Sequence, residues 1–172
     1  TAKLAGREDD LRIFSCGNPE ISHPYNAIGS GTSNQLKDRV MGALNWSEEF
    51  YKNEASSFLL KILRGLTLLR DRKRQPFDLG TILSCITDQN QITRVIDEIP
   101  ETETQVREEL EGLHRHLAKP ENVKALQGLK SQLESLLLSD FGHLLRAHDG
   151  GIDLFEAIRH QKIVYLLLDS RT

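Results

Sequence analysis

The stretch Lys162-Ile163-Val164-Tyr165-Leu166-Leu167-Leu168-Asp169 is the strongest fold signal in this chain. It is a continuous apolar run with β-branched and aromatic members, which is typical of a strand buried on both faces of a parallel sheet. One other stretch, Leu11-Arg12-Ile13-Phe14-Ser15-Cys16, has comparable strand character, and the sequence between the two is helical in pattern. Because a long helical crossover permits a parallel connection, we predict that 11–16 and 163–168 pair in parallel.

Two strands of this inner-sheet type cannot form a stable sheet on their own. We therefore expect the chain to be part of a larger α/β protein. The predicted fold is mainly α, a multi-helix all-α domain with two short flanking β-strands left from the parent α/β core. The predicted division is a strand and loop segment over 1–32, an all-α domain over 33–160, and a returning strand over 161–172.

Composition narrows the class of protein without naming a function. The 172 residues fit one domain, and 38% hydrophobic and 27% charged residues are ordinary for a globular chain. The net charge of −3 gives no overall attraction to nucleic acid, so any DNA contact must come from a local patch. Cys16 and Cys85 lack a metal-ligand spacing and are interpreted as small buried residues in a reducing compartment. No membrane-length apolar run is present.

Apolar residues recur at three- and four-residue spacing through the middle of the chain, as amphipathic helices require. Capping residues and prolines divide this region into segments. The predicted starts are Thr32 or Ser33, Ser47, Asp78, Asp88, Thr102, Pro120, Ser139 and Asp153. The longest helix is predicted to bury Phe50 and Phe58 and to end near Arg70–Arg74. The helix from Pro120 is predicted to run through Leu137.

No motif for catalysis or metal binding stands out in the sequence. Gly29-Ser30-Gly31-Thr32 lacks the lysine and the preceding strand of a phosphate-binding loop, so we interpret it as a flexible turn. His114 and His116 are two residues apart and point in different directions on a helix, which makes them a poor metal pair. We therefore predict no catalytic residue, no metal site and no cofactor in this chain, although a triad assembled only in three dimensions stays open.

Two charged clusters are the candidate binding residues. The basic cluster, predicted to contact DNA phosphates, is Arg64, Arg70, Arg72, Lys73 and Arg74. The alternative interpretation of the basic residues is that they complement the helix dipole at a helix C-terminus. The acidic cluster, a weaker candidate for protein docking, is Glu108, Glu109 and Glu111. Its alternative interpretation is a solvated helix face.

Several short strings resemble the conjugative type IV coupling proteins, the TraD-like family of DNA-pumping ATPases. They are Gly6-Arg7, Asp10-Leu11-Arg12-Ile13, Pro24-Tyr25-Asn26-Ala27-Ile28, Gln35-Leu36-Lys37-Asp38, Trp46-Ser47-Glu48-Glu49-Phe50-Tyr51, Gly151-Ile152-Asp153-Leu154 and Ile163-Val164-Tyr165-Leu166-Leu167-Leu168-Asp169-Ser170. Where this chain has Asn26-Ala27-Ile28, the family usually shows Asn-Pro-Leu or Asn-Pro-Ile. The resemblance covers nearly the whole chain.

The resemblance implies a specific place in a larger bacterial protein. Members have a RecA-like ATPase domain with an inserted all-α domain, and this chain resembles that inserted domain with its two flanking strands. The parent would be a membrane-anchored hexamer at the cytoplasmic face of the inner membrane, using ATP and Mg²⁺, whereas this fragment would touch no membrane. The motifs for phosphate and magnesium binding would lie outside the chain, so we predict that the fragment is not an enzyme.

The function implied by the resemblance is substrate recognition in conjugation. The module would engage the relaxosome, through DNA or through the relaxase, and pass the substrate to the type IV secretion motor. The alternative is a purely protein-binding receptor for relaxase or accessory factors without DNA contact. The negative net charge favours this alternative, because non-specific DNA binding rests on phosphate neutralisation.

Overall fold

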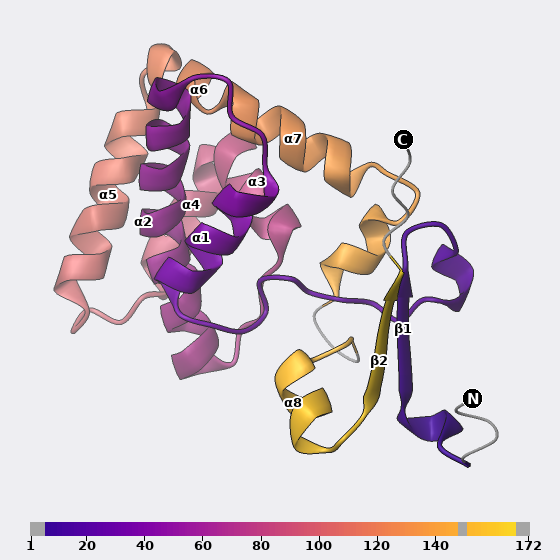
Figure 1. The fold of residues 1–172 in the computed structure, drawn as a ribbon. Helices are drawn as coiled ribbons and strands as arrows, with labels where there is room; N and C mark the ends of the chain where they lie inside the picture. Colours follow the sequence, from indigo (N-terminus) through magenta and orange to yellow (C-terminus); the bar gives the residue numbers. More distant parts are fainter. Residues whose placement is uncertain (1–5, 148–150, 168–172) are drawn as a thin grey trace. The chain divides into compact units, whose positions relative to one another are not determined.

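A computed structural model describes residues 6–147 and 151–167 of the chain. The chain divides into two compact units, one formed by 28–136 and the other by 1–27 together with 137–172. The first unit is helical and the second contains both strands (Figure 1). The predicted mainly helical fold with two short strands is confirmed. Leu168, Asp169 and Ser170, at the end of the predicted second strand, lie outside the described residues.

The helical unit is built around one long helix, α2. Its helices are α1 (Ser33–Ala43), α2 (Glu49–Lys73), α3 (Leu79–Thr87), α4 (Gln89–Glu98), α5 (Thr104–Leu117), α6 (Pro120–Ala125) and α7 (Gln127–Leu137). α2 packs against α1, α4 and α5, and these surround it in Figure 1. Its buried stripe includes Leu59, Ile62 and Leu63, which are fully buried. Burial of this stripe is the main source of the unit's stability, since each such side chain contributes roughly 1.5–3 kcal/mol.

Several predicted caps are confirmed because side-chain oxygens satisfy the first backbone N–H groups of their helices. Thr32 accepts from the Gln35 N–H, and Asp78 accepts from the Thr81 N–H. In both cases the third residue of the helix bonds back to the cap, completing a capping box. Asp88 and Asp153 also cap their helices.

Three expectations about helix boundaries are wrong. α2 begins after Glu48, which makes no side-chain cap, rather than after Ser47, and Phe50 is 62% exposed instead of buried. α5 begins at Thr104 rather than near Thr102. The predicted single helix from Pro120 is two helices that break at Leu126. Leu126 is itself buried, so the break keeps an apolar anchor facing the core.

The strand-containing unit pairs β1 (Leu11–Ser15) with β2 (Ile163–Leu167) in parallel, as predicted. It also contains the 3₁₀ turns η2 (Glu8–Asp10), η3 (Pro19–Ile21) and η4 (Gly142–Arg146) and the short helix α8 (Leu154–Arg159). Residues 137–160, which the sequence suggested as part of the all-α domain, group with these strands. The backbone explains this grouping, because the N–H groups of Tyr25 and Ile152 donate to the carbonyls of Leu144 and Pro24.

Three polar side chains join the start of β1 to the start of β2. Lys162 Nζ lies 2.7 Å from Asp10 Oδ1, and Arg7 Nε lies 3.1 Å from Asp10 Oδ2. Arg7 also donates to the carbonyl of Gln161, a residue in the left-handed region with φ 51°. Hydrogen bonds from Lys162 and then Arg7 hold the pKa of Asp10 below its ordinary value. Charge pairing therefore supports the strand register at this end.

β2 is less buried than its sequence suggests. Tyr165 and Leu166 are 55% and 44% exposed, and the rest of the strand is half-buried. Tyr165 and Leu166 point to opposite faces of the sheet, so neither face is covered as an inner strand's would be, and among the described residues only β1 pairs with β2. Within that same part of the chain, no helix is long and apolar enough to cross a membrane.

Candidate functional site

Charged side chains pair along one line between α2 and α5. Three pairs join α2 to α5 or to its N-cap residue: Glu54 with His116, Arg64 with Glu109, and Arg72 with Glu103, which directly precedes α5. The α2 numbers rise while the α5 numbers fall, so the helices run antiparallel. We call this line of three pairs the α2–α5 seam. Its central pair, Arg64 with Glu109, joins one residue from each of the two sites that the sequence predicted separately.

The central pair of the seam is the tightest. Arg64 Nη1 lies 2.6 and 2.7 Å from the two oxygens of Glu109, and Gln105 Nε2 donates to Glu109 Oε1 at 3.0 Å. The side chains of Arg64 and Glu109 are 37% and 24% exposed. A pair this open to solvent contributes about 1 kcal/mol or less. Its main consequence is that each charge already has a partner of opposite sign.

Arg70 holds a loop rather than lining the seam. Its guanidinium donates to the carbonyls of Gly29 and Gly31 at 3.2 and 2.9 Å, and Nε donates to Asp71. The guanidinium carbon also lies 5.8 Å from the centre of the Phe77 ring, within the range of cation–π attraction. The carbonyls of this glycine-rich loop therefore face a cation, which is the opposite of an anion-binding cradle of N–H groups.

The last three basic residues of the cluster lie at the C-terminal end of α2. Arg72 is 67% exposed and bonds Glu103 at 3.1 Å. Lys73 is exposed, and Arg74 ends the helix in the left-handed region with φ 55°. Neither Lys73 nor Arg74 forms an ion pair within the described ranges. Of the five predicted phosphate contacts, these two are therefore the ones whose charge is not matched inside the fold.

The acidic cluster divides between the seam and the surface. Glu109 belongs to the seam, Glu108 is exposed and Glu111 is half-buried. Within the part of the chain that the structure describes, Glu108 and Glu111 pair with no cation. They are available for docking a basic partner, which stays a prediction.

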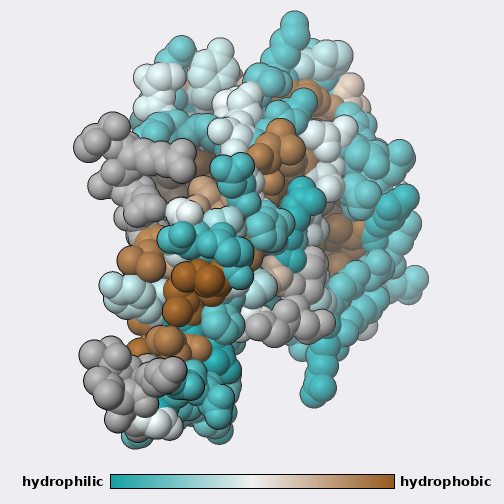
Figure 2. Space-filling model, turned by 90° about the vertical axis from the view of Figure 1, so that its right-hand side faces the viewer, coloured by the Kyte–Doolittle hydropathy of each residue, from teal (hydrophilic) through white to brown (hydrophobic). Residues whose placement is uncertain are grey.

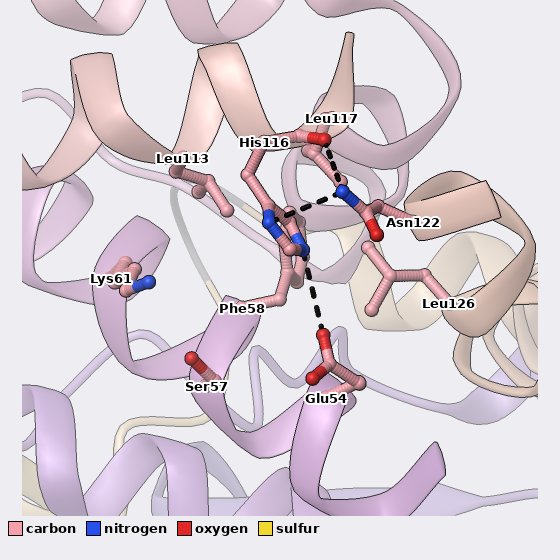
Figure 3. Close-up of a pocket in the computed structure, with 9 residues that line it drawn as sticks. All are labelled: Glu54, Ser57, Phe58, Lys61, Leu113, His116, Leu117, Asn122 and Leu126. Atoms are coloured by element: carbon pink, nitrogen blue, oxygen red, sulfur yellow. Dashed lines mark hydrogen bonds and ion pairs between the residues drawn. The ribbon is translucent and has the colours of Figure 1, made fainter. Parts of the chain in front are cut away.

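A small notch lies at the Glu54 end of the seam (Figure 3). Its apolar floor is formed by Phe58, Leu113, Leu117 and Leu126, and its polar wall by Glu54, Ser57, Lys61, His116 and Asn122. The cavity measures about 90 Å³. Small-molecule sites typically enclose about 300–1,000 Å³, so this notch is large enough for one side chain and too small for a nucleotide.

The chemistry of His116 argues against a catalytic role in the notch. Asn122 Nδ2 lies 3.2 Å from His116 Nδ1 and 2.8 Å from the His116 carbonyl, so the amide donates to both. Glu54 Oε2 lies 3.6 Å from the other ring nitrogen, Nε2. A general base needs a ring nitrogen with an available lone pair. Here one nitrogen accepts from the amide and the other faces a carboxylate, so neither is placed to activate the nearby Ser57.

A second, open depression lies over the other end of the seam. It measures about 290 Å³ and is lined by Ser33, Arg64, Thr67, Leu68, Asp71, Arg72 and Val106. Its lining combines two apolar residues, Leu68 and Val106, with polar residues and charges of both signs. Such a mixed surface resembles a protein-docking surface more than the uniformly basic groove that a nucleic-acid backbone requires.

No family model, curated protein or solved structure matches this chain. The resemblance to coupling ATPases therefore rests on the sequence strings alone. Likewise, within residues 6–147 and 151–167, no three His, Cys, Asp or Glu side chains gather in a way that could hold a metal ion.

Sequence reasoning missed the partners in the seam. Glu54 and Asn122 were not singled out, Glu103 was noted only as part of an acidic stretch, and His116 was considered only as a metal ligand. Pairs within one helix are visible as i, i+3 or i, i+4 spacings. Glu54 and His116 lie on different helices, so only the antiparallel packing of α2 on α5 brings them together. The available signal was the complementary charge of two neighbouring helices, and it does not specify register.

Proposed function

We propose that this chain is a non-catalytic protein-docking module of a conjugative coupling ATPase. In this role it binds relaxase or an accessory protein and does not itself grip DNA. The observation that carries the proposal is the charge pairing of the basic cluster. Arg64 and Arg72 are matched by Glu109 and Glu103, and Arg70 is used to hold backbone carbonyls.

Pairing matters because DNA affinity depends on cations that neutralise phosphates and release counterions. A cation already paired with a carboxylate must first lose that partner, and the freed carboxylate would then face the DNA. The net charge of −3 adds repulsion over the whole surface. Protein docking has no such requirement, and a surface of mixed charge with some apolar residues suits it.

Two titrations of the full chain test this function. Calorimetry should detect saturable binding of the relaxase encoded by the same conjugative element, and no measurable binding of a short single- or double-stranded oligonucleotide at physiological salt. The relaxase interaction should weaken when Glu108 and Glu111 are replaced by Gln. Tight oligonucleotide binding, or no interaction with relaxase, would contradict the proposal.

A direct DNA contact is the second candidate, and the unmatched charges of Lys73 and Arg74 favour it. If they touch phosphates, Lys73→Ala with Arg74→Ala should flatten the slope of log affinity against log salt by about one unit per lost contact. The matched control is Arg115→Ala with Lys119→Ala, which removes two exposed cations elsewhere on the helical unit. An equal effect of both double variants would indicate non-specific attraction instead of a site.

A further inference from the structure

The start of α2 carries an exposed pair of aromatic side chains. Phe50 and Tyr51 are 62% and 40% exposed, and their rings meet edge to face with centroids 5.4 Å apart. The other large hydrophobic side chains of the helical unit are buried or half-buried. Interface centres are enriched in aromatic residues, which supply a large contact area at a small cost in conformational entropy. We call Phe50 and Tyr51 the aromatic ledge.

The aromatic ledge continues into the notch shown in Figure 3. Phe50, Glu54 and Phe58 are spaced four residues apart and therefore share one face of α2. Glu54 forms part of the polar wall of the notch, and Phe58 forms part of its floor. Because an α-helix rises 1.5 Å per residue, Phe50 and Phe58 are about 12 Å apart along α2. The ledge and the notch thus form one strip, short enough for a few residues of a partner to cover.

The strip begins with an excess of negative charge. Residues 48–54 contain three carboxylates, those of Glu48, Glu49 and Glu54, and a single ammonium group, that of Lys52. Lys52 Nζ lies 3.8 Å from Glu49 Oε2, and the two side chains are 46% and 75% exposed. Glu48 forms no ion pair within the described part of the chain. Aromatic rings beside carboxylates attract a cation in two ways, through the face of the ring and through the ion pair.

The notch fits the shape of a long cationic side chain. Arginine and lysine combine an apolar stem with a charged head, and the notch combines an apolar floor with the Glu54 carboxylate. That carboxylate faces His116 Nε2 at 3.6 Å, which is too far for a hydrogen bond, and the ring is charged only when it is protonated. Lys61, the ammonium group in the wall, is two turns beyond Glu54 and can turn away on its flexible stem. Glu54 is therefore placed to receive the charged head.

From these features we infer that the strip binds a protein segment in which a cationic side chain lies close to an apolar one. The apolar side chain packs on the aromatic ledge, and the cationic side chain enters the notch and pairs with Glu54. A nucleic acid would bring phosphates to these carboxylates, and a second copy of the strip would bring like charges together. The inference rests on the proposed docking function for the partner being a protein, and it adds a surface apart from Glu108 and Glu111.

Three short labelled peptides, titrated with the full chain and followed by fluorescence anisotropy, test the chemistry of the partner. The first carries leucines and arginines between alanines, the second has serines in place of the leucines, and the third has glutamines in place of the arginines. The first peptide should bind at least several-fold more tightly than either of the others. Equal binding of all three, or no binding of the first, would overturn the inference. A chain that binds the first peptide but no relaxase would contradict the proposed function alone.

An aromatic variant and its control locate the binding on the ledge. Phe50→Ala should weaken binding of the first peptide by about tenfold, because an aromatic side chain is lost from the centre of the contact. Phe155→Ala is the matched control and should leave the affinity unchanged. Phe155 is 78% exposed and belongs to the strand-containing unit, and Figure 2 shows apolar surface in brown on the side of the molecule that includes the strands. Equal losses in these two variants would refute binding at the ledge.

A charge variant locates the cation in the notch. Glu54→Gln should weaken binding of the arginine peptide several-fold and leave binding of the glutamine peptide unchanged, since only the former loses an ion pair. Circular dichroism shows that each variant keeps the fold of the parent chain. If Glu54→Gln changes the affinity for both peptides by the same factor, the cation does not pair with Glu54 and the inference fails.

Discussion

At the scale of single residues, surroundings give similar side chains different roles. Arg70 and Arg72 are two positions apart on α2, yet their side chains are 19% and 67% exposed. Arg70 donates to two carbonyls and a carboxylate, so its removal would take two hydrogen bonds from α2 away from the Gly29–Gly31 loop. Replacing Arg72 would remove one surface ion pair, which contributes about 1 kcal/mol or less. Arg70 is therefore structural in this fold.

The buried thiol of Cys85 makes the stability of the folded chain depend on pH in the alkaline range. Burial, followed by the charge of Asp88, raises its pKa from 9.0 to about 12. Between these values the unfolded chain loses the thiol proton while the folded chain keeps it. Stability should therefore fall as pH rises from 9 to 12, with this group contributing up to a few kcal/mol of the loss.

The measurement that isolates this term is urea unfolding of the parent chain and of Cys85→Ala over that pH range. Other groups titrate there in both proteins, so the difference in slope belongs to Cys85. The variant should be less stable at neutral pH because of the cavity, yet lose stability less steeply as pH rises. Parallel slopes would show that the thiol ionises as easily in the folded state.

At the scale of elements, the close approach of α2 to α4 and α5 depends on a glycine. A Cβ at Gly65 would lie 2.8 Å from Leu110 Cδ1 and 3.2 Å from Val95 Cγ1. Leu110 is fully buried and Val95 nearly so, which limits how far either side chain can move. A glycine inside a helix is otherwise unfavourable by about 1 kcal/mol relative to alanine. Packing therefore outweighs helix propensity at this position.

Gly65→Ala should accordingly destabilise the helical unit by up to roughly 2 kcal/mol, the overpacking penalty less the gain in helix propensity. Gly112→Ala on α5 is the control, because its Cβ would meet nothing within 4 Å. The control should be neutral or stabilising by up to about 1 kcal/mol. Urea unfolding followed by circular dichroism measures both. A Gly65→Ala variant as stable as the parent would mean that α2 and α5 separate easily.

Local signals explain which elements the sequence predicted well. Thr32, Asp78, Asp88 and Asp153 act through their own neighbours' N–H groups, so their caps are visible in a short window of sequence. Phe50 shows the limit of such local signals. Its spacing matches the buried stripe of α2, yet it is exposed, because none of the described helices covers the first turn of α2. The charge pairs of the α2–α5 seam could not be predicted from local sequence either, since they depend on how α2 and α5 align.

At the scale of the whole molecule, sequence and structure divide the chain differently. The sequence suggested an all-α domain over 33–160, whereas the compact helical unit spans 28–136. Composition does not separate 137–160 from the helices before it, because η4 and α8 carry apolar residues too. The decisive contacts are two backbone hydrogen bonds, from the Tyr25 N–H to the Leu144 carbonyl and from the Ile152 N–H to the Pro24 carbonyl. A pattern of side chains cannot predict such bonds. Ile28, which is only 1% exposed, belongs to the helical unit.

The two boundaries make opposite predictions for excised fragments. Residues 28–136 should fold alone, with a helical circular dichroism spectrum and a cooperative urea transition, because α1–α6 and most of α7 bury their apolar stripes within that range. Residues 33–160 should be less stable despite being longer. That fragment loses Ile28 and the carbonyls that Arg70 binds, and it carries 137–160 without Tyr25 and Pro24. If 33–160 unfolds at higher urea than 28–136, the sequence boundary is the better one, and residues 137–160 draw their stability from the helices and not from the strands.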